Sequence, residues 1–185
     1  MKHCLTLPGA LLALVLLAFQ PTAALAQPAN SLGVRFTGGF GLQDGTWLND
    51  YPSFGAELSY QHYFTPKSRL EADLGFRIYD IHPETKRLYT DWLIVTSYQW
   101  RWPIGQTAGF YAGPAIQYGF KYFWFGVGAQ TGFDWHFKGP LQLSVDFRPT
   151  WSWWSGIDAC LSIGLRYSFG SDLASRANLK SSSGR

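Results

Sequence analysis

Residues 69–79, Arg-Leu-Glu-Ala-Asp-Leu-Gly-Phe-Arg-Ile-Tyr, decide the fold. Every second residue from Leu70 to Ile78 is apolar, and the residues between them are mostly charged. A period of two places alternate residues on opposite faces of a β-strand. Residues 31–42 repeat the pattern, with apolar residues separated by glycine, arginine and threonine. Both stretches are therefore predicted to be strands with one apolar and one polar face.

The same alternation predicts eight strands, at 31–42, 54–64, 68–79, 88–102, 107–119, 122–137, 140–151 and 157–169. Each is near or above the roughly 9–11 residues that a tilted strand needs to cross a bilayer. No segment between them has a helical apolar period long enough for a helix that could cover the apolar faces. The predicted fold class is therefore all-β: an eight-stranded antiparallel transmembrane up-and-down β-barrel, with its apolar face toward lipid and its polar face inward.

The two ends of the chain are predicted to lie outside the barrel. Residues 1–26 have a basic start at Lys2, an apolar run over 11–19 and an Ala-Leu-Ala cleavage site, which are the features of a cleaved signal peptide. Residues 27–170 form the predicted barrel domain. Residues 171–185 are rich in serine and poor in apolar residues, which predicts a disordered tail. The chain is thus interpreted as the precursor of an exported protein.

Composition agrees with a barrel that crosses a membrane. Aromatic residues make up 18% of the chain, yet the mean hydropathy is only −0.08. This combination is typical of transmembrane strands, because polar lumen residues offset the lipid-facing ones. Of the two cysteines only Cys160 lies beyond the signal peptide, so no intramolecular disulfide is expected. A closed strand ring supplies stability in another way, because it leaves no unpaired edge.

Aromatic residues gather near the predicted strand ends, in two groups. Tryptophan and tyrosine favour the headgroup level of a membrane, so we interpret the groups as outer and inner girdles. The outer girdle is predicted to contain Trp92, Trp151, Trp153 and Trp154, and the inner girdle Tyr63, Trp100, Trp102 and Trp135. Residues 151–154 are also a candidate contact for lipid or for a hydrophobic ligand. The alternative is that these rings pack the core of a soluble β-sandwich.

Two stretches carry a family likeness. Residues 122–149 resemble the late strands of small Gram-negative outer-membrane β-barrel proteins, the eight-stranded OmpA/OmpX/OmpW-like barrels. Residues 161–169, which end Gly-Leu-Arg-Tyr-Ser-Phe, look like the last strand of that family. The resemblance makes Phe169 the expected assembly signal, although residues 170–185 follow it where the family usually ends. It implies a porin-like protein of the cell outer membrane. Its expected partners are outer-membrane lipid, the barrel assembly machinery and periplasmic chaperones.

The polar phase of the strands predicts the contents of the lumen. An eight-stranded barrel is just wide enough for side chains to fill, and buried charges are stable only when paired. The predicted ion-pair network consists of Arg35, Glu57, Arg69, Glu71, Asp73, Arg77, Arg101, Asp134, Asp146, Arg148, Asp158 and Arg166. Glutamines such as Gln117 and inward glycines complete the lining. The alternative, a narrow polar conduit or gated pore, stays open.

The sequence offers little for catalysis or for binding a cofactor. Beyond the signal peptide the histidines are His62, His82 and His136, and their spacing matches no metal site or nucleophile–base pair. No glycine-rich phosphate loop and no basic stripe for nucleic acid is present. We therefore expect no enzyme activity, no catalytic, metal or cofactor-binding residues, no cofactor and no nucleic-acid partner.

Three functions fit these observations. The first is an integral outer-membrane barrel with a structural or surface-interaction role, meeting an unidentified surface ligand through residues 43–53, 80–87 and 152–156. The second is a narrow pore or a transporter for small hydrophobic molecules, with a wall opening where Pro114 and Pro149 interrupt the strand ladders. The third is a soluble periplasmic, lipocalin-like barrel that binds a ligand inside, which requires the opposite face to point inward.

Overall fold

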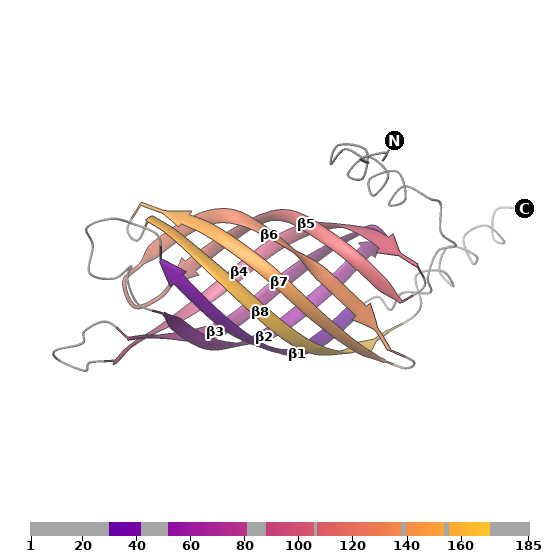
Figure 1. The fold of residues 1–185 in the computed structure, drawn as a ribbon, viewed down its shortest axis with the longest axis horizontal. Coiled ribbons are helices and arrows are strands. Elements are labelled where there is room, and N and C mark those ends of the chain that lie inside the picture. Colours follow the sequence, from indigo (N-terminus) through magenta and orange to yellow (C-terminus); the bar gives the residue numbers. More distant parts are fainter. Residues whose placement is uncertain are drawn as a thin grey trace, which may run out of the picture.

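The computed structural model describes residues 30–41, 52–80, 88–105, 107–137, 140–153 and 156–170. These residues form one closed barrel of antiparallel strands in chain order (Figure 1). The strands are β1 (Asn30–Gly41), β2 (Ser53–Thr65), β3 (Ser68–Asp80), β4 (Leu88–Ile104), β5 (Ala108–Gly119), β6 (Trp124–His136), β7 (Leu141–Ser152) and β8 (Gly156–Phe169). The predicted signal peptide and tail lie outside the described residues. Within the described ranges, no helix is long and apolar enough to cross a membrane.

The predicted fold class is confirmed, and most strand bounds differ from the prediction by one or two residues. The later start of the sixth strand has a structural reason. The segment predicted to begin at residue 122 starts at Trp124, because residues 120–123 form the turn between β5 and β6. Phe123 in this turn has a φ of 53°, a left-handed conformation that ends strand geometry. Aromatic residues fill both phases here, so the alternation carried no signal for the turn.

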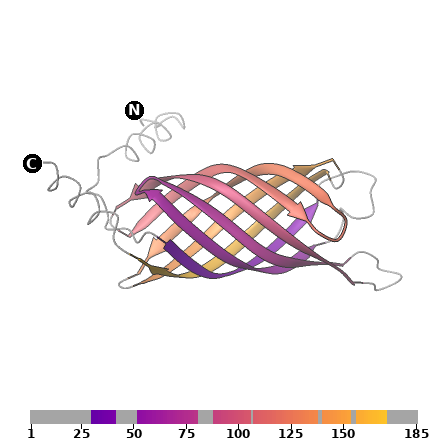
Figure 2. The same ribbon diagram turned by 180° about the vertical axis from the view of Figure 1, so that it is seen from behind.

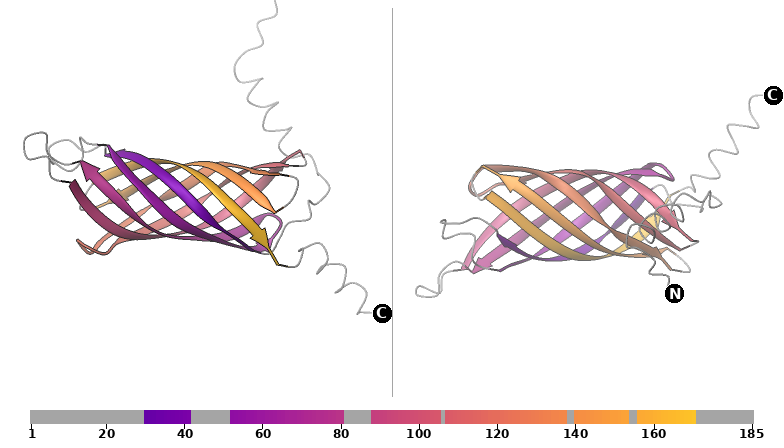
Figure 3. Two further views of the ribbon diagram at one scale, coloured as in Figure 1. Left: turned by 90° about the horizontal axis from the view of Figure 1, so that it is seen from below. Right: turned by 45° about the horizontal axis from the view of Figure 1, so that its top comes forward.

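The register staggers the strands around the ring. Starting at Ser31, successive pairs lead through Gln61, Glu71, Ser97, Ala115, Gly128, Thr150 and Asp158. Asp158 pairs with Gly41, which lies ten residues beyond Ser31 on β1 (41 − 31 = 10). A stagger of this kind tilts strands by roughly 35–45° from the barrel axis. Figures 2 and 3 show the strands running obliquely around the barrel from every side.

The barrel has two distinct ends. At the terminal end β1 begins at Asn30 and β8 ends at Phe169, and these two residues are paired. At the loop end β1 finishes at Gly41 and β2 begins at Ser53. The β2–β3 connection at the terminal end is a tight turn, in which the Thr65 hydroxyl accepts a hydrogen bond of 3.2 Å from the backbone N–H of Lys67.

The apolar face of the strands points outward and the polar face points inward. On β8, Leu161 and Ile163 are each 58% exposed, whereas Ser162 between them is 1% exposed. A barrel with this phase has a mainly polar interior and an apolar outer belt, which suits a surrounding of lipid. The soluble lipocalin-like alternative requires the opposite phase, so the observed side-chain directions contradict it.

Candidate functional site

Six arginines lie inside the barrel, and each is at most 2% exposed. Each occupies the inward phase of its strand: Arg35 on β1, Arg69 and Arg77 on β3, Arg101 on β4, Arg148 on β7 and Arg166 on β8. A guanidinium stays charged at any physiological pH and presents a fork of donors. Its burial therefore requires carboxylates and other acceptors close by.

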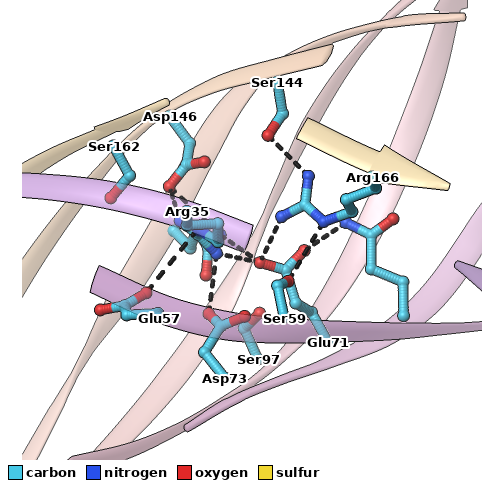
Figure 4. A network of polar contacts seen from close by, with 12 residues as sticks. Arg35, Glu57, Ser59, Glu71, Asp73, Ser97, Ser144, Asp146, Ser162 and Arg166 are labelled. Atoms are coloured by element: carbon cyan, nitrogen blue, oxygen red, sulfur yellow. Dashed lines mark hydrogen bonds and ion pairs between the residues drawn. The ribbon is translucent and has the colours of Figure 1, made fainter. Parts of the chain in front are cut away.

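Arg35 is the centre of the lumen network (Figure 4). Its Nη1 contacts Glu71 and lies 2.7 Å from Asp73 Oδ2, both on β3, and its Nη2 contacts Asp146 on β7. Its Nε lies 3.7 Å from Glu57 on β2. A single side chain on β1 thus contacts three other strands. They are its neighbour β2, the next strand β3, and β7, which is separated from β1 by β8.

Arg148 and Arg166 complete this central group. Arg148 Nη2 donates to Glu57 Oε1 at 2.5 Å, and its Nη1 lies 3.3 Å from Asp73 Oδ2. Arg166 Nη2 lies 3.1 Å from Glu71 Oε1, and its other nitrogens donate to the hydroxyls of Ser144 and Ser59 at 2.6 and 3.1 Å (Figure 4). Charge-assisted hydrogen bonds of this kind are stronger than neutral ones.

A second group lies toward the terminal end. Asp134 on β6 accepts hydrogen bonds from Arg101 Nη2 at 2.8 Å and from Arg69 Nη1 at 2.7 Å. The Arg69 guanidinium also lies over the Tyr111 ring, 4.2 Å from its centroid, as in a cation–π contact. Gly109 makes room for this group, because a Cβ atom there would lie 2.5 Å from Arg101 Cζ.

The predicted lumen residues all face inward, and each lies within ion-pair distance of an opposite charge. The remaining pair, Arg77 with Asp158, lies toward the loop end. Among the described residues, no group of histidine, cysteine, aspartate and glutamate could hold a metal ion. His136 faces the Asp134 carboxylate at 3.7 Å. His62 faces outward and its Nδ1 shares a hydrogen bond of 2.8 Å with Asn30.

Sequence reasoning missed several lumen residues. Tyr63 was wrongly placed in the inner girdle: it is 2% exposed and its hydroxyl accepts a hydrogen bond from Arg69. The available signal was His62, the preceding residue: because His62 is in the outward phase, Tyr63 must point inward. Asp91 and Trp124 are also buried in the lumen and bond to each other. The alternation of β6 places Trp124 inward, but the aromatic run before it hid that phase.

The predicted girdle tryptophans lie on the outer surface where the structure describes them. Trp92, Trp151 and Trp153 are exposed toward the loop end, and Trp100 and Trp135 toward the terminal end. Trp102 is half-buried and stands near the end of β4, with its ring 5.6 Å from that of Phe110. Trp154 lies outside the described residues. Phe169, the expected assembly signal, is the exposed last residue of β8.

Comparison with known proteins gives likeness in structure alone. No protein-family model matches the chain, and no curated protein matches it. Neisserial surface protein A is similar at a TM-score of 0.59 and 13% identity, over 76% of this chain and 97% of that one. Ail, the attachment invasion locus protein of Yersinia pestis, solved with the heparin analogue sucrose octasulfate, is similar at 0.57 and 10%, over 77% and 99%. A de novo designed transmembrane β-barrel is similar at 0.53 and 13%, over 77% and 98%.

These likenesses and the closed ring give the chain the fold of eight-stranded transmembrane β-barrels. The resemblance to small outer-membrane barrels is confirmed at the level of the fold.

Proposed function

We propose that this protein is an integral barrel of the bacterial outer membrane with a structural or surface-interaction role, and that it neither catalyses a reaction nor conducts ions. Its partners are membrane lipid around the apolar belt and, during assembly, the barrel assembly machinery and chaperones. A surface ligand would meet the loop end. The location rests on the likeness to outer-membrane barrels and on the outward apolar phase.

One observation carries the proposal: charged side chains tie non-adjacent strands of the barrel together through its lumen. Arg35 on β1 reaches Asp146 on β7, Arg148 on β7 reaches Glu57 on β2, and Arg69 on β3 reaches Asp134 on β6. Ions crossing the lumen would have to break these contacts in a region of low dielectric constant, where separating charges is costly. A lumen filled in this way suits a rigid scaffold for surface loops.

Bilayer conductance tests this proposal directly. The mature protein, reconstituted into planar lipid bilayers, is expected to give no discrete conductance steps, whereas a large open porin run in parallel gives them. Fractionation of a Gram-negative host that expresses the precursor is expected to recover the protein from the outer membrane. Its gel mobility should then change on boiling, as folded barrels resist detergent. Conductance steps, or recovery from the soluble periplasm, would overturn the proposal.

A transporter for small hydrophobic molecules is the second candidate, and one observation favours it. Pairing between β4 and β5 stops at Ser97–Ala115 and resumes at Trp100–Ala112, around Pro114. Proline lacks the N–H that a ladder needs. Replacing Pro114 with valine is expected to slow uptake of a hydrophobic dye into cells if the wall opens there. Equal uptake by both forms, and by cells without the protein, would exclude this function.

A further inference from the structure

Gln117 on β5 is the one glutamine in the described residues whose side chain makes no hydrogen bond. It is 1% exposed, and neither Oε1 nor Nε2 has a partner there. The other described glutamines, Gln61, Gln99, Gln130 and Gln142, each donate at least one side-chain hydrogen bond. Buried polar groups in native proteins are almost always paired, with protein, ordered water or another bound species. The unpaired amide therefore points to an occupant of the lumen.

The wall around Gln117 offers it no partner. In the register, Gln117 stands between Val95 on β4 and Gly126 on β6. Its inward neighbours on β5 are Ala115 and Gly119. None of these four side chains can form a hydrogen bond, and Val95 and Ala115 are fully buried. A single amide on an apolar, glycine-lined wall has the composition of a small-molecule site, in contrast to the charged lumen beside it.

Trp124 closes this wall toward the loop end. Its indole faces inward, is 7% exposed and donates from Nε1 to Asp91 Oδ2 at 2.8 Å. The other oxygen of Asp91 accepts a hydrogen bond of 2.8 Å from the backbone N–H of Lys121 in the β5–β6 turn. A Cβ atom on Gly119 would lie 2.0 Å from the indole nitrogen, so the ring rests against the backbone next to Gln117. The indole thus stands between the amide and the loop end.

We propose that the lumen beside Gln117 binds a small uncharged molecule, larger than water, that both donates and accepts hydrogen bonds, and that Trp124 is its lid. A primary amide presents both a donor and an acceptor, so amides, ureas and small alcohols complement it. An anionic ligand finds no spare counter-charge here, because Arg77 and Arg148 pair with Asp158 and Glu57. For a cation, the Asp91 carboxylate already accepts hydrogen bonds from the Trp124 indole and the Lys121 backbone. The ligand is small because an eight-stranded barrel leaves little space between its walls.

Nuclear magnetic resonance of the ¹⁵N-labelled mature protein in lipid nanodiscs tests the site, with acetamide as the probe. The Gln117 side-chain amide and the Trp124 indole N–H are identified as the signals lost in Gln117→Leu and Trp124→Phe. Both signals are expected to shift and saturate with acetamide, while the Gln142 amide at the terminal end does not. Acetate, of similar size but charged, is expected to cause no saturating shift. The proposal would be overturned if the Gln117 and Gln142 signals both shifted linearly with acetamide concentration, without saturating. It would also be overturned if the Gln117 amide contacted only water.

A matched pair of variants separates binding from general damage. Gln117→Leu is expected to abolish the saturating shift of Trp124, and Gln142→Leu is expected to preserve it. Should Gln117→Leu fail to show a heat-dependent gel mobility, Gln117→Met, which is closer in shape, takes its place. A Trp124 shift that saturates unchanged in the folded Gln117 variant would refute the role of the amide. Either result leaves the conductance test of the proposed function unaffected.

Discussion

Replacing Arg148 with leucine is expected to destabilise the barrel and leave it closed. The Arg148 side chain is completely buried, and its Nη2 donates a hydrogen bond of 2.5 Å to Glu57 Oε1. Without Arg148, Glu57 keeps an ion pair with Arg35, whose Nε lies 3.7 Å from Glu57 Oε2. Asp73 is affected less, since it keeps Arg35 at 2.7 Å. Leucine thus leaves the buried Glu57 carboxylate without its shorter ion pair.

Breaking a buried ion pair from one side costs about 3–5 kcal/mol in the free energy of unfolding. This corresponds to a change of roughly 10²–10⁴-fold in the unfolding equilibrium, because each 1.4 kcal/mol is a factor of ten. With a typical urea dependence of 1–3 kcal/mol per molar, the unfolding midpoint should fall by about 1–5 M. The assay is urea titration of the protein in lipid vesicles, with the folded fraction read from gel mobility without boiling.

Two further variants make the result specific to the charge. Lys67→Leu removes the same charge from an exposed turn and is expected to leave the midpoint nearly unchanged. Adding Glu57→Leu to Arg148→Leu is expected to recover part of the loss, because the poorly compensated Glu57 carboxylate is then removed as well. An unchanged midpoint for a correctly folded Arg148→Leu would refute the view that ion pairs hold the lumen together.

Three more outcomes follow from the same structure. Leu161→Arg, on the exposed outer face, is expected to cost about 2–4 kcal/mol in bilayers, and an unchanged urea midpoint would argue against contact with lipid. The Cys160 thiol is 1% exposed, so a maleimide polymer should add mass only after unfolding; labelling of the native barrel would place the thiol on the surface. Gly109→Val should displace the Arg101 guanidinium, 2.5 Å from the new Cβ, and lower the free energy of unfolding by about 1–3 kcal/mol. Gly38→Val, with only Phe54 at 3.9 Å, is its control and should change little.

The two-residue alternation was sufficient to predict the fold and the inward charges. A strand has only two faces, so one apolar residue in phase assigns its neighbours, as Leu70 and Leu74 do for Glu71 and Asp73. In a closed barrel whose apolar face is not covered by a helix, that face points outward, toward lipid. Because the phase of each strand alone assigns direction, the arginines could be predicted to point inward before their ion-pair partners were known.

The partners themselves depend on register, which the sequence pattern does not contain. Arg35 meets Asp146, 111 positions away, because Arg35 pairs with Gly164 on β8, and Gly164 pairs with Ser144, two residues before Asp146 on β7. The pattern also fails where both phases are aromatic. Around the β5–β6 turn it gave no sign that Trp124 points inward and Phe123 ends the strand geometry.

The central claim is that one phase of the strands faces lipid and the other an enclosed lumen. Methyl-labelled wild-type protein in lipid nanodiscs tests this claim without substitution, through magnetisation transfer from the lipid acyl chains to aliphatic side chains. Transfer is expected to the methyl groups of Leu161, Ile163 and Leu165, which point outward, and not to those of Leu93 and Val95, which are buried in the lumen. Transfer to Leu93 and Val95, with none to the three residues of β8, would contradict the account.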